Sequence, residues 1–582
     1  MTTHFEVLDR DATARLGELR LDDPVTTPGL LGDRIADAGS LWTEDREIPD
    51  GDPDALTVLP HRAMPRGTPE EVVEGMQPEH DAVDWPSAAV VSVDAPEPSG
   101  QDCYVLTGLR HDHARSLVDG VVRARRALEP DAALMLSGVA TPRNVALLAY
   151  VGVDGFDEDR AVVEGTAGVY MTRRIERDVD ELDELPCGCR ICADAEPGDL
   201  DGENVADHNA FALRGALAEV RDAIRAGDLR AFVEGQVRNA RWQVEALRRM
   251  DERRSYVDRR WPVGDTTKLR ANSGESMDRR DVRRFMERVV DRYTAPRDDV
   301  AVLLPCSARK PYSESQSHGE FRSAIGGRAH EVVLTSPIGV VPRELEQTYP
   351  AGHYDTPVTG RWTPTEVAVV GDVLGSYLDR NGYDRVVAHV ERDGYGDVVE
   401  RAVGTLDDGP DVTWTVDGDG HPRDGDALER LSDALDGEDA PSHAVALAWH
   451  MRGVADYQWG EDAFDERFDL ADVRVEGRLP RPRLWRDDEQ LATLSPEYGM
   501  LALTRAGADA FDVPTVTIDD FVPSGSVLAP GVLDCPDGVR VGDEVAFEGP
   551  SARGVGRARM FDEEMVASTR GVAVDVRHVE EK

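Results

Sequence analysis

The order of hydrophobic and polar residues in the first part of the chain predicts β–α–β units. Three apolar runs have the length of buried strands, at residues 88–93, 103–109 and 133–139. Between the second and the third run, apolar residues near Leu117, Val121 and Leu128 recur at helical spacing. A strand, a helix and a strand at this spacing predict neighbouring parallel strands in one sheet.

The segments around this predicted sheet differ in character. Residues 41–85 are polar and rich in Pro, Asp and Glu, and they predict a loop with little regular structure. A helix is predicted from Pro142 with Thr141 as its N-cap, and VGVDGFD predicts a short strand that ends at Asp157. Residues 208–250 carry apolar residues at helical spacing and predict a long amphipathic helical region.

A second α/β region follows residue 300. Strands are predicted at residues 301–305, 331–335 and 385–390, and helices near residues 319–325, 364–380 and 443–457. Thr363 is the N-cap candidate for the helix that begins at Pro364. Residues 405–440 are dominated by Asp and Gly and predict an exposed connector. The last seventy residues hold short β-like runs separated by Gly, Pro and Asp, which predict a small barrel.

These patterns divide the chain into five parts. The parts are residues 1–250, 251–296, 297–405, 425–508 and 512–582. We expect an α/β domain, a helical linker, a central α/β domain, a small α+β domain and a C-terminal β-barrel, in that order. A chain of 582 residues is long enough for several domains.

The charge balance is strongly acidic. There are 66 Lys and Arg against 113 Asp and Glu, for a net charge of −47, and only three of the basic residues are Lys. Such a surface normally repels nucleic acid. At molar salt, however, the Debye length is about 3 Å, so the acidity keeps a protein soluble without excluding an RNA partner. We favour a salt-loving source; the alternative is an acidic enzyme from a mesophile.

The N-terminal sequence and the cysteines indicate a reduced, cytoplasmic protein. The first residues lack the apolar segment of a signal peptide. No window reaches the ~18 apolar residues that a membrane span needs, so we expect no membrane partner. Six cysteines are too few for a disulfide framework in a chain of this length.

Three of the six cysteines gather in one short motif. Cys187, Cys189 and Cys192 lie close together, and His208 follows sixteen residues later. Three thiolates and one imidazole form a closed tetrahedral set, which suits structural zinc. The alternative is three unliganded thiols near an unrelated histidine.

A second polar cluster follows the strand predicted at residues 301–305. One loop, in the sequence AVLLPCSARKPYSESQSH, holds five polar side chains: Cys306, Lys310, Tyr312, Ser315 and His318. Polar residues at the end of a buried strand often line sites. Lys differs from Arg where a titratable amine is needed. We therefore expect this loop to carry function, although one of three lysines has to fall somewhere.

The cysteine motif resembles the zinc motif of tRNA-guanine transglycosylases. In that family a His-Asn pair completes the motif, and His208-Asn209 matches it. The segment that carries the nucleophilic Asp of the family is resembled by GVDGFDEDRAVVEGTAGVYMT, in which Asp157 takes that position. The opening of the archaeal members is resembled by FEVLDRDATARLGEL. The resemblance covers roughly residues 1–250 and implies a zinc-bearing (β/α)-barrel with Asp157 at a C-terminal strand end.

One part of the transglycosylase pattern is missing. The second catalytic Asp of that family lies in a Ser-Gly-Ser-Phe-Gln-like segment, and residues 30–90 hold nothing similar. Base exchange needs a nucleophile and also a second group that binds and deprotonates the incoming base. Asp157 is therefore either a residue that binds the substrate base or a relic.

The polar loop narrows the resemblance to one branch. The loop is similar to a motif of archaeosine synthases, the archaeal paralogues of the transglycosylases. In this motif Pro-Cys is followed after three residues by Lys-Pro-Tyr, after two more by Ser and after a further two by His. VLAPGVLDCPDGVRVGDEVAFEG resembles a PUA domain, an RNA-binding barrel. The resemblance now spans nearly the whole chain. It implies an α/β multidomain fold: a degenerate (β/α)-barrel with a structural zinc site, a central α/β domain, a small α+β domain and a C-terminal PUA β-barrel.

This resemblance implies a reaction. Archaeosine synthases attach free lysine to the nitrile of 7-cyano-7-deazaguanine in the D-arm of tRNA, and a radical-SAM partner converts the adduct to archaeosine. Cys306 would attack the nitrile, helped by Lys310 or by protonated His318, which would also shuttle protons. Tyr312 and Ser315 would hold the lysine or the imine nitrogen. The alternative for Cys306 is a small buried side chain at a strand end.

Other functions and partners stay open. An active transglycosylase is favoured by Asp157 and opposed by the missing second Asp, and a non-catalytic tRNA-presenting subunit would not need the polar loop. Weaker site predictions are the polar cluster His353 to Asp355, an RNA contact at the Arg run 478–486, and a PUA RNA face at residues 527–533 with Arg557 and Arg559. The sequence leaves the oligomeric state open, a homodimer included.

Overall fold

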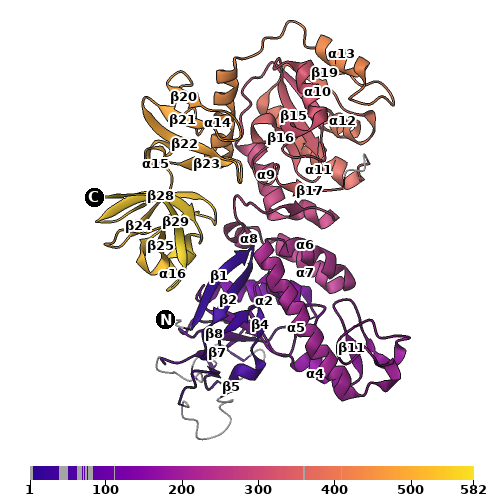
Figure 1. The fold of residues 1–582 in the computed structure, drawn as a ribbon, viewed down its shortest axis with the longest axis vertical. Coiled ribbons are helices and arrows are strands. Elements are labelled where there is room, and N and C mark those ends of the chain that lie inside the picture. Colours follow the sequence, from indigo (N-terminus) through magenta and orange to yellow (C-terminus); the bar gives the residue numbers. More distant parts are fainter. Residues whose placement is uncertain are drawn as a thin grey trace. The chain divides into compact units, whose positions relative to one another are not determined.

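The structure is a computed structural model that describes residues 4–37, 50–61, 68–69, 71–72, 75, 83–110, 112–357, 361–407 and 409–582 (Figure 1). Its contacts divide the chain into two compact units. The first comprises residues 1–261, 527–538 and 560–573, and the second comprises residues 262–526, 539–559 and 574–582. Most of the loop expected over residues 41–85 lies outside the described residues. In the described part the expectation is wrong, because β6 (Leu56–Val58) pairs with strands on both sides in the main sheet of the first unit.

The first unit contains a seven-stranded sheet in the order β4-β10-β9-β8-β7-β6-β5. Its strands are β4 (Gly29–Leu30), β5 (Ile35–Asp37), β6 (Leu56–Val58), β7 (Ser87–Ser92), β8 (Cys103–Thr107), β9 (Ala133–Leu136) and β10 (Gly155–Phe156). Every neighbouring pair is parallel. With β4 and β5 at its two edges, the sheet is an open, partial barrel, which confirms the degenerate (β/α)-barrel.

The smaller sheets of the first unit are antiparallel. One contains β1 (Phe5–Asp11), β2 (Ala14–Leu19) and β3 (Val25–Thr27), and a hairpin is formed by β11 (Val169–Met171) and β12 (Glu176–Asp178).

One of the helical predictions for this unit needs correction. Its helices are α2 (Ala114–Ala127), α3 (Val145–Val151), α4 (Asp159–Thr166), α5 (Gly202–Ala226), α6 (Leu229–Gln236), α7 (Arg241–Asp251) and α8 (Arg254–Arg260). The helix expected from Pro142 begins three residues later, because Asn144 Oδ1 accepts from the Thr141 N–H at 2.9 Å and holds a turn there. The helical region predicted over 208–250 is confirmed and consists of three helices, the first of which ends at Gly227 in the left-handed conformation.

The second unit is built around a five-stranded sheet in the order β16-β15-β14-β18-β19. The strands are β14 (Val300–Pro305), β15 (His330–Thr335), β16 (Gly339–Pro342), β18 (Arg385–Ala388) and β19 (Asp411–Trp414). β14 is fully buried in the middle and runs parallel to both β15 and β18. The chain leaves β14 toward one edge and returns on its other side, so the ends of β14 and β18 form a topological switch point.

Helices precede, connect and follow these strands. They are α9 (Arg280–Asp291), α10 (Gln316–Ile325), α11 (Pro364–Asn381), α12 (Asp397–Gly404) and α13 (Gly425–Asp433). The N-cap expected at Thr363 is confirmed, because Thr363 Oγ1 accepts from the Glu366 N–H and Glu366 bonds back to the Thr363 N–H. The connector expected over 405–440 was wrong, since β19 pairs with β18 there and α13 buries Leu431.

Two further sheets follow the central one. After α14 (His443–Trp459), the strands β20 (Val473–Glu476), β21 (Arg483–Arg486), β22 (Glu489–Ser495) and β23 (Met500–Leu503) form an antiparallel sheet. The helix α15 (Arg505–Phe511) comes next. The last sheet has the order β25-β29-β28-β27-β24-β26. Its strands are β24 (Thr515–Ile518), β25 (Ser526–Leu528), β26 (Val532–Asp534), β27 (Glu544–Glu548), β28 (Ala552–Ala558) and β29 (Val572–Glu581).

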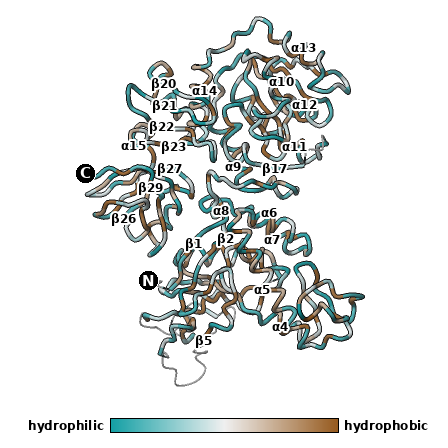
Figure 2. The backbone as a smooth tube through the Cα atoms, viewed as in Figure 1, coloured by the Kyte–Doolittle hydropathy of each residue, from teal (hydrophilic) through white to brown (hydrophobic). Residues whose placement is uncertain are grey.

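Hydrophobic residues, brown in Figure 2, gather in the interior of each unit, where they form separate buried clusters. Among the described helices, none is long and apolar enough to cross a membrane.

Candidate functional site

The polar loop begins at the switch point of the central sheet. Cys306 follows β14 directly and is half-buried. Its Sγ lies 3.1 Å from Oη of Tyr395, which comes from the loop after β18, and its backbone N–H donates to the same oxygen at 3.2 Å. Because that oxygen accepts the N–H, its own hydrogen is free to donate to Sγ. Burial and the neighbouring Cys306 raise the pKa of Tyr395, so the phenol keeps its proton.

Glycine is required beside this tyrosine. Gly394 has a φ of +68°, and a Cβ there would come within 2.6 Å of the Trp362 ring. The same indole packs edge-on against Tyr395 with ring centroids 5.0 Å apart. The two contacts fix where the phenol points.

Lys310 lies near the same thiol. Its Nζ stands 3.8 Å above the centroid of the Tyr354 ring, a cation–π contact. Burial lowers the pKa of Lys310, and a negative charge on Cys306 acts to raise it again. The site therefore contains a thiol with a phenol donor and a partly buried amine close by.

Tyr312 fixes the loop from inside. It is buried, and its Oη lies 2.6 Å from Oη of Tyr354, which in turn lies 2.5 Å from Oγ1 of Thr335 at the end of β15. Burial raises the pKa of Tyr312 and of Tyr354. This chain of hydroxyl groups ties the loop to the neighbouring parallel strand.

Ser315 and His318 complete the loop at the start of α10. Ser315 Oγ accepts from the His318 N–H at 3.2 Å as the N-cap of the helix. The buried His318 ring donates from Nε2 to the Pro305 carbonyl oxygen at 3.0 Å and stacks on Tyr312. Burial lowers the pKa of His318 to about 4, so the ring is neutral near pH 7. Of the two cations considered for the thiolate, the geometry favours Lys310.

The structure brings together all five side chains of the loop but gives them different surroundings. Cys306 and Lys310 are partly exposed, whereas Tyr312, Ser315 and His318 are buried in internal contacts. Sequence reasoning missed Tyr395. It lies in ERDGYGD after a predicted strand, but its place beside Cys306 follows from the order of strands in the sheet, which the sequence pattern does not give.

Asp157 lies at the C-terminal end of β10, as expected for the transglycosylase nucleophile. Both of its carboxylate oxygens accept from the Gly138 N–H, at 2.9 and 3.0 Å, and Oδ1 also accepts from the Asp159 N–H at 3.3 Å. The side chain is 4% exposed. The carboxylate thus links the loops after β9 and β10.

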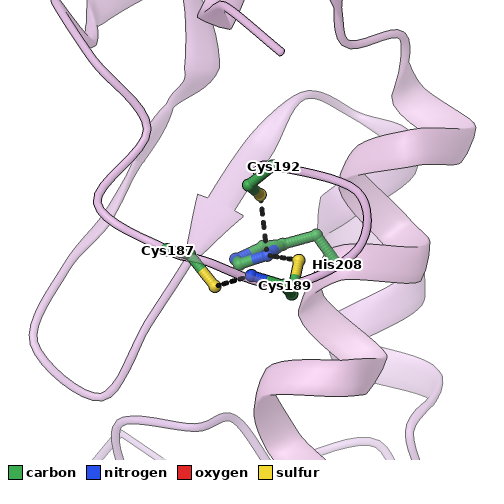
Figure 3. Close-up of side chains that lie close together, drawn as sticks. All are labelled: Cys187, Cys189, Cys192 and His208. Carbon is green, nitrogen blue, oxygen red and sulfur yellow. Dashed lines mark hydrogen bonds between the residues drawn. The ribbon is translucent and has the colours of Figure 1, made fainter. Parts of the chain in front are cut away.

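The cysteine motif forms a compact cluster in the first unit. The ligand atoms of Cys187, Cys189, Cys192 and His208 all lie within 4.8 Å of one another (Figure 3). Nδ1 of His208 is 3.6 Å from the Cys189 Sγ and 3.4 Å from the Cys192 Sγ. Tetrahedral bonds of about 2.3 Å to sulfur and 2.0 Å to nitrogen give ligand separations of this size. The four residues can hold one metal ion.

Neighbouring side chains orient the histidine for this role. His208 Nε2 donates to the Met171 carbonyl oxygen at 2.8 Å, which leaves Nδ1 as the ligand atom. Tyr170 stacks on the imidazole with ring centroids 3.9 Å apart, and its Oη lies 3.4 Å from the Cys192 Sγ. Asn209 accepts from the Met171 N–H at 2.8 Å and so fixes α5 to the hairpin.

An arginine-lined cavity lies on the small antiparallel sheet. Its volume is about 540 Å³, and its lining includes Arg481, Arg483 and Arg577. Arg577 donates to both carboxylate oxygens of Glu544. Within the described part of the chain, Arg481 and Arg483 are exposed and pair with no carboxylate.

The residues suggested for the PUA RNA face have mixed surroundings. Arg557 donates to the carbonyl oxygens of Gly264 and Gly542 and packs over the Tyr498 ring, so its guanidinium serves internal contacts. Leu528 and Leu533 are exposed.

Comparison with known families covers most of the chain. Residues 62–241 match the family described as queuine tRNA-ribosyltransferase, and residues 282–435 match a domain described only as of unknown function. Residues 450–512 match the patch-forming domain C2 of tRNA-guanine transglycosylase, and residues 514–579 match the PUA domain. An archaeosine synthase from Haloferax volcanii is 48% identical over 100% of both chains.

The chain belongs to the archaeosine synthase family. Archaeosine synthase subunit alpha of Methanosarcina acetivorans is 39% identical, again over 100% of both chains. A tRNA-guanine(15) transglycosylase of Methanothermobacter thermautotrophicus is 26% identical over 80% of this chain and 68% of its own. Membership in the archaeosine synthase family confirms the resemblance and supports a role in archaeosine modification of tRNA. Among the matched family domains, the loop from Cys306 to His318 falls in the one described as of unknown function.

The buried His318 predicts a pH effect on stability. Its folded pKa of about 4 lies below the ordinary value of 6.5, so the unfolded chain takes up a proton that the folded chain does not. Stability from this group is complete above pH 6.5 and is lost as the pH falls toward 4. We expect wild type to lose up to about 1.4 kcal/mol per pH unit more than His318→Gln in this window.

Denaturant unfolding at constant high salt, at several pH values between 7 and 4.5, measures the difference between the two proteins. Glutamine keeps a donor for the Pro305 carbonyl oxygen. Parallel pH profiles for the two proteins would show that His318 titrates normally.

Proposed function

We propose that this chain catalyses the amidine-forming step of archaeosine synthesis, in which lysine adds to the nitrile of 7-cyano-7-deazaguanine in the D-arm of tRNA. The observation that carries the proposal is the contact of the Cys306 thiol with Tyr395 at the switch point, with Lys310 nearby. A thiol, a phenol donor and an amine of lowered pKa are suited to adding a nucleophile to a nitrile. The family membership supports tRNA as the substrate.

In the first step the Cys306 thiolate adds to the nitrile carbon. A C–S bond forms, one C–N π bond breaks, and the nitrogen takes a proton from the Lys310 ammonium to give a thioimidate. The Tyr395 O–H and the Lys310 charge stabilise the thiolate before attack. Lys310 is then a neutral amine, a state favoured by the burial that lowers its pKa.

In the second step neutral Lys310 removes a proton from the ammonium of the incoming lysine. The freed amine attacks the thioimidate carbon, the C–S bond breaks and the thiolate returns. A proton moves from the attacking nitrogen to the imine nitrogen, and the product is an amidinium. Nitrile and alkylammonium together contain every atom of this product, so no other reactant is needed. Tyr312, Ser315 and His318 act by holding the loop in place.

The test is to incubate the protein with nitrile-bearing tRNA and lysine at high salt and to weigh the digested nucleosides. Wild type is expected to add one lysine. Cys306→Ala removes the nucleophile and should lower the rate roughly a thousandfold or more. Tyr395→Phe loses a hydrogen bond to a charged group and should lower the rate roughly tenfold to a hundredfold.

Cys103→Ala is the matched control, because it removes a buried thiol from the first unit. Normal lysine addition by Cys306→Ala would eliminate the covalent route. Exchange of labelled guanine into tRNA would instead support an active transglycosylase, the second candidate, which the strand-end position of Asp157 favours. No change in the tRNA at all would support a non-catalytic presenting subunit.

The metal bound by the cysteine cluster is proposed to be zinc in a structural role. Three thiols and one imidazole suit zinc, and with four protein ligands such a site keeps no position for water. Bound zinc would supply a cross-link between the cysteine loop and α5, and residues in this cluster take no part in the reaction above. The ion would then stabilise the first unit.

We expect one zinc per purified chain and its loss in Cys189→Ala, with a lower melting temperature. Elemental analysis and thermal unfolding provide the two measurements. Cys535→Ala, a buried thiol outside the cluster, should keep its zinc. Full zinc content in Cys189→Ala would remove Cys189 from the ligand set.

Contact with the tRNA backbone is proposed for the arginine-lined cavity. Two unpaired guanidinium groups in so acidic a chain suit phosphate, and at high salt only contacts at bonding distance survive screening.

We expect Arg481→Ala and Arg483→Ala each to weaken tRNA binding and to reduce the slope of log K against log salt by about one. Binding titrations over a salt series measure this. Arg401→Ala, which removes a surface arginine paired with Asp372, should leave the slope unchanged; an equal change in that variant would contradict the assignment.

A partner enzyme completes the proposal. The name of the Methanosarcina acetivorans relative describes it as a subunit alpha. We infer that a radical-SAM protein takes the lysine adduct from this chain and converts it to archaeosine in the cytoplasm.

A further inference from the structure

Two of the three lysines of the chain lie at the candidate active site. Lys310 belongs to the polar loop, and Lys268 precedes β13 (Leu269–Arg270), which pairs in parallel with β17 (Tyr354–Asp355). Lys268 Nζ lies 2.8 Å from Oδ2 of Asp355. The side chains of Lys268 and Asp355 are 66% and 58% exposed, so this pair faces solvent.

The pair is connected to the catalytic groups through one strand. Successive residues of a strand point to opposite faces. Tyr354 points inward, where its ring contacts the Lys310 amine and its hydroxyl contacts Tyr312, and Asp355 points outward beside Lys268. The charges of Asp355 and Lys268 act on the Lys310 amine together with that of Cys306, so the pair lies within electrostatic range of the amine.

Stability does not explain this pair. An exposed ion pair contributes about 0–1 kcal/mol, and salt reduces that further. Elsewhere the chain almost always uses Arg for such pairs. The hydrogen bond from the Lys268 ammonium lowers the pKa of Asp355, and the positive charges of Lys310 and Arg270 lower it further, so the carboxylate stays charged.

The geometry points to Lys268 and Asp355 as the subsite for the α-carboxylate and α-ammonium of the lysine substrate. This inference rests on the proposed function. An amino-acid head group carries one cation and one anion on the same carbon, and a contacting Lys–Asp pair presents one partner for each. In the absence of the amino acid the two side chains neutralise each other. When it binds, each exchanges its neighbour for the opposite charge of the ligand.

The subsite also selects between the two amines of lysine. With the head group held by Lys268 and Asp355, the α-amine is paired with a carboxylate and is kept from the nitrile. The side-chain amine is the end left to approach Cys306 and Lys310. The pair would therefore determine which amino acid is used and which of its nitrogens reacts.

The experiment measures steady-state kinetics on nitrile-bearing tRNA with three amines: lysine, cadaverine, which lacks the carboxylate, and 6-aminohexanoate, which lacks the α-amine. Lys268→Ala should raise the KM for lysine roughly tenfold to a hundredfold and leave cadaverine unchanged, because a charged hydrogen bond to the carboxylate is lost. Asp355→Asn should raise the KM for lysine similarly and leave 6-aminohexanoate unchanged. In both variants kcat should stay near the wild-type value, and Lys268→Arg should recover most of the affinity for lysine.

Lys582→Ala is the matched control, since it removes the remaining lysine, whose Nζ lies 2.6 Å from a Glu548 oxygen. A wild-type KM for lysine in both Lys268→Ala and Asp355→Asn would overturn the inference. So would a rise in the KM for tRNA alone, which would assign the pair to the RNA. Equal use of the three amines by wild type would reject this subsite while the proposed function stands. Failure of wild type to add any amine would reject the proposed function as well.

Discussion

The parallel pairing of β14 with both β15 and β18 is the constraint on which the candidate active site depends. It places the end of a fully buried strand between two neighbours, so the loops that follow all three strands meet at one edge. Cys306 comes from the first of these loops and Tyr395 from the third. Thr335, at the end of the second strand, holds the hydroxyl chain that fixes Tyr312.

Burial decides which side chains of the loop can react. Tyr312 and His318 are held in place by contacts of their polar atoms with Tyr354 and with the Pro305 carbonyl oxygen. Burial keeps both side chains in their neutral forms. Cys306 and Lys310 remain partly open to solvent, and Lys310 has the pKa shift that burial of an amine produces. The loop therefore combines a rigid interior with two accessible groups, an arrangement suited to catalysis.

Hydrophobic pattern predicted the strands of both α/β regions well, because buried parallel strands form continuous apolar runs. It did not predict β6, which lies in a polar segment, or β19, where Asp and Gly surround a short edge strand; tertiary pairing stabilises both. The cysteine cluster was recognisable from spacing, since its ligands are close in sequence. Asp355 belonged to the predicted polar cluster His353 to Asp355. Tyr395 and Lys268 were not predicted, because they are placed by strand order and by a two-residue strand pairing, which have no local sequence signature.

The lysine at position 310 differs from arginine in the proton chemistry that it allows. Arginine stays charged at any physiological pH, makes bidentate contacts with carboxylates and serves for nearly every ion pair here. In the proposed reaction, an arginine at position 310 would stabilise the Cys306 thiolate, but it could not give its proton to the nitrile nitrogen and take another from the incoming amine. A partly buried lysine can do both, because burial brings its pKa down toward the working pH. In the proposed reaction, a lysine at position 310 therefore supplies proton transfer as well as charge.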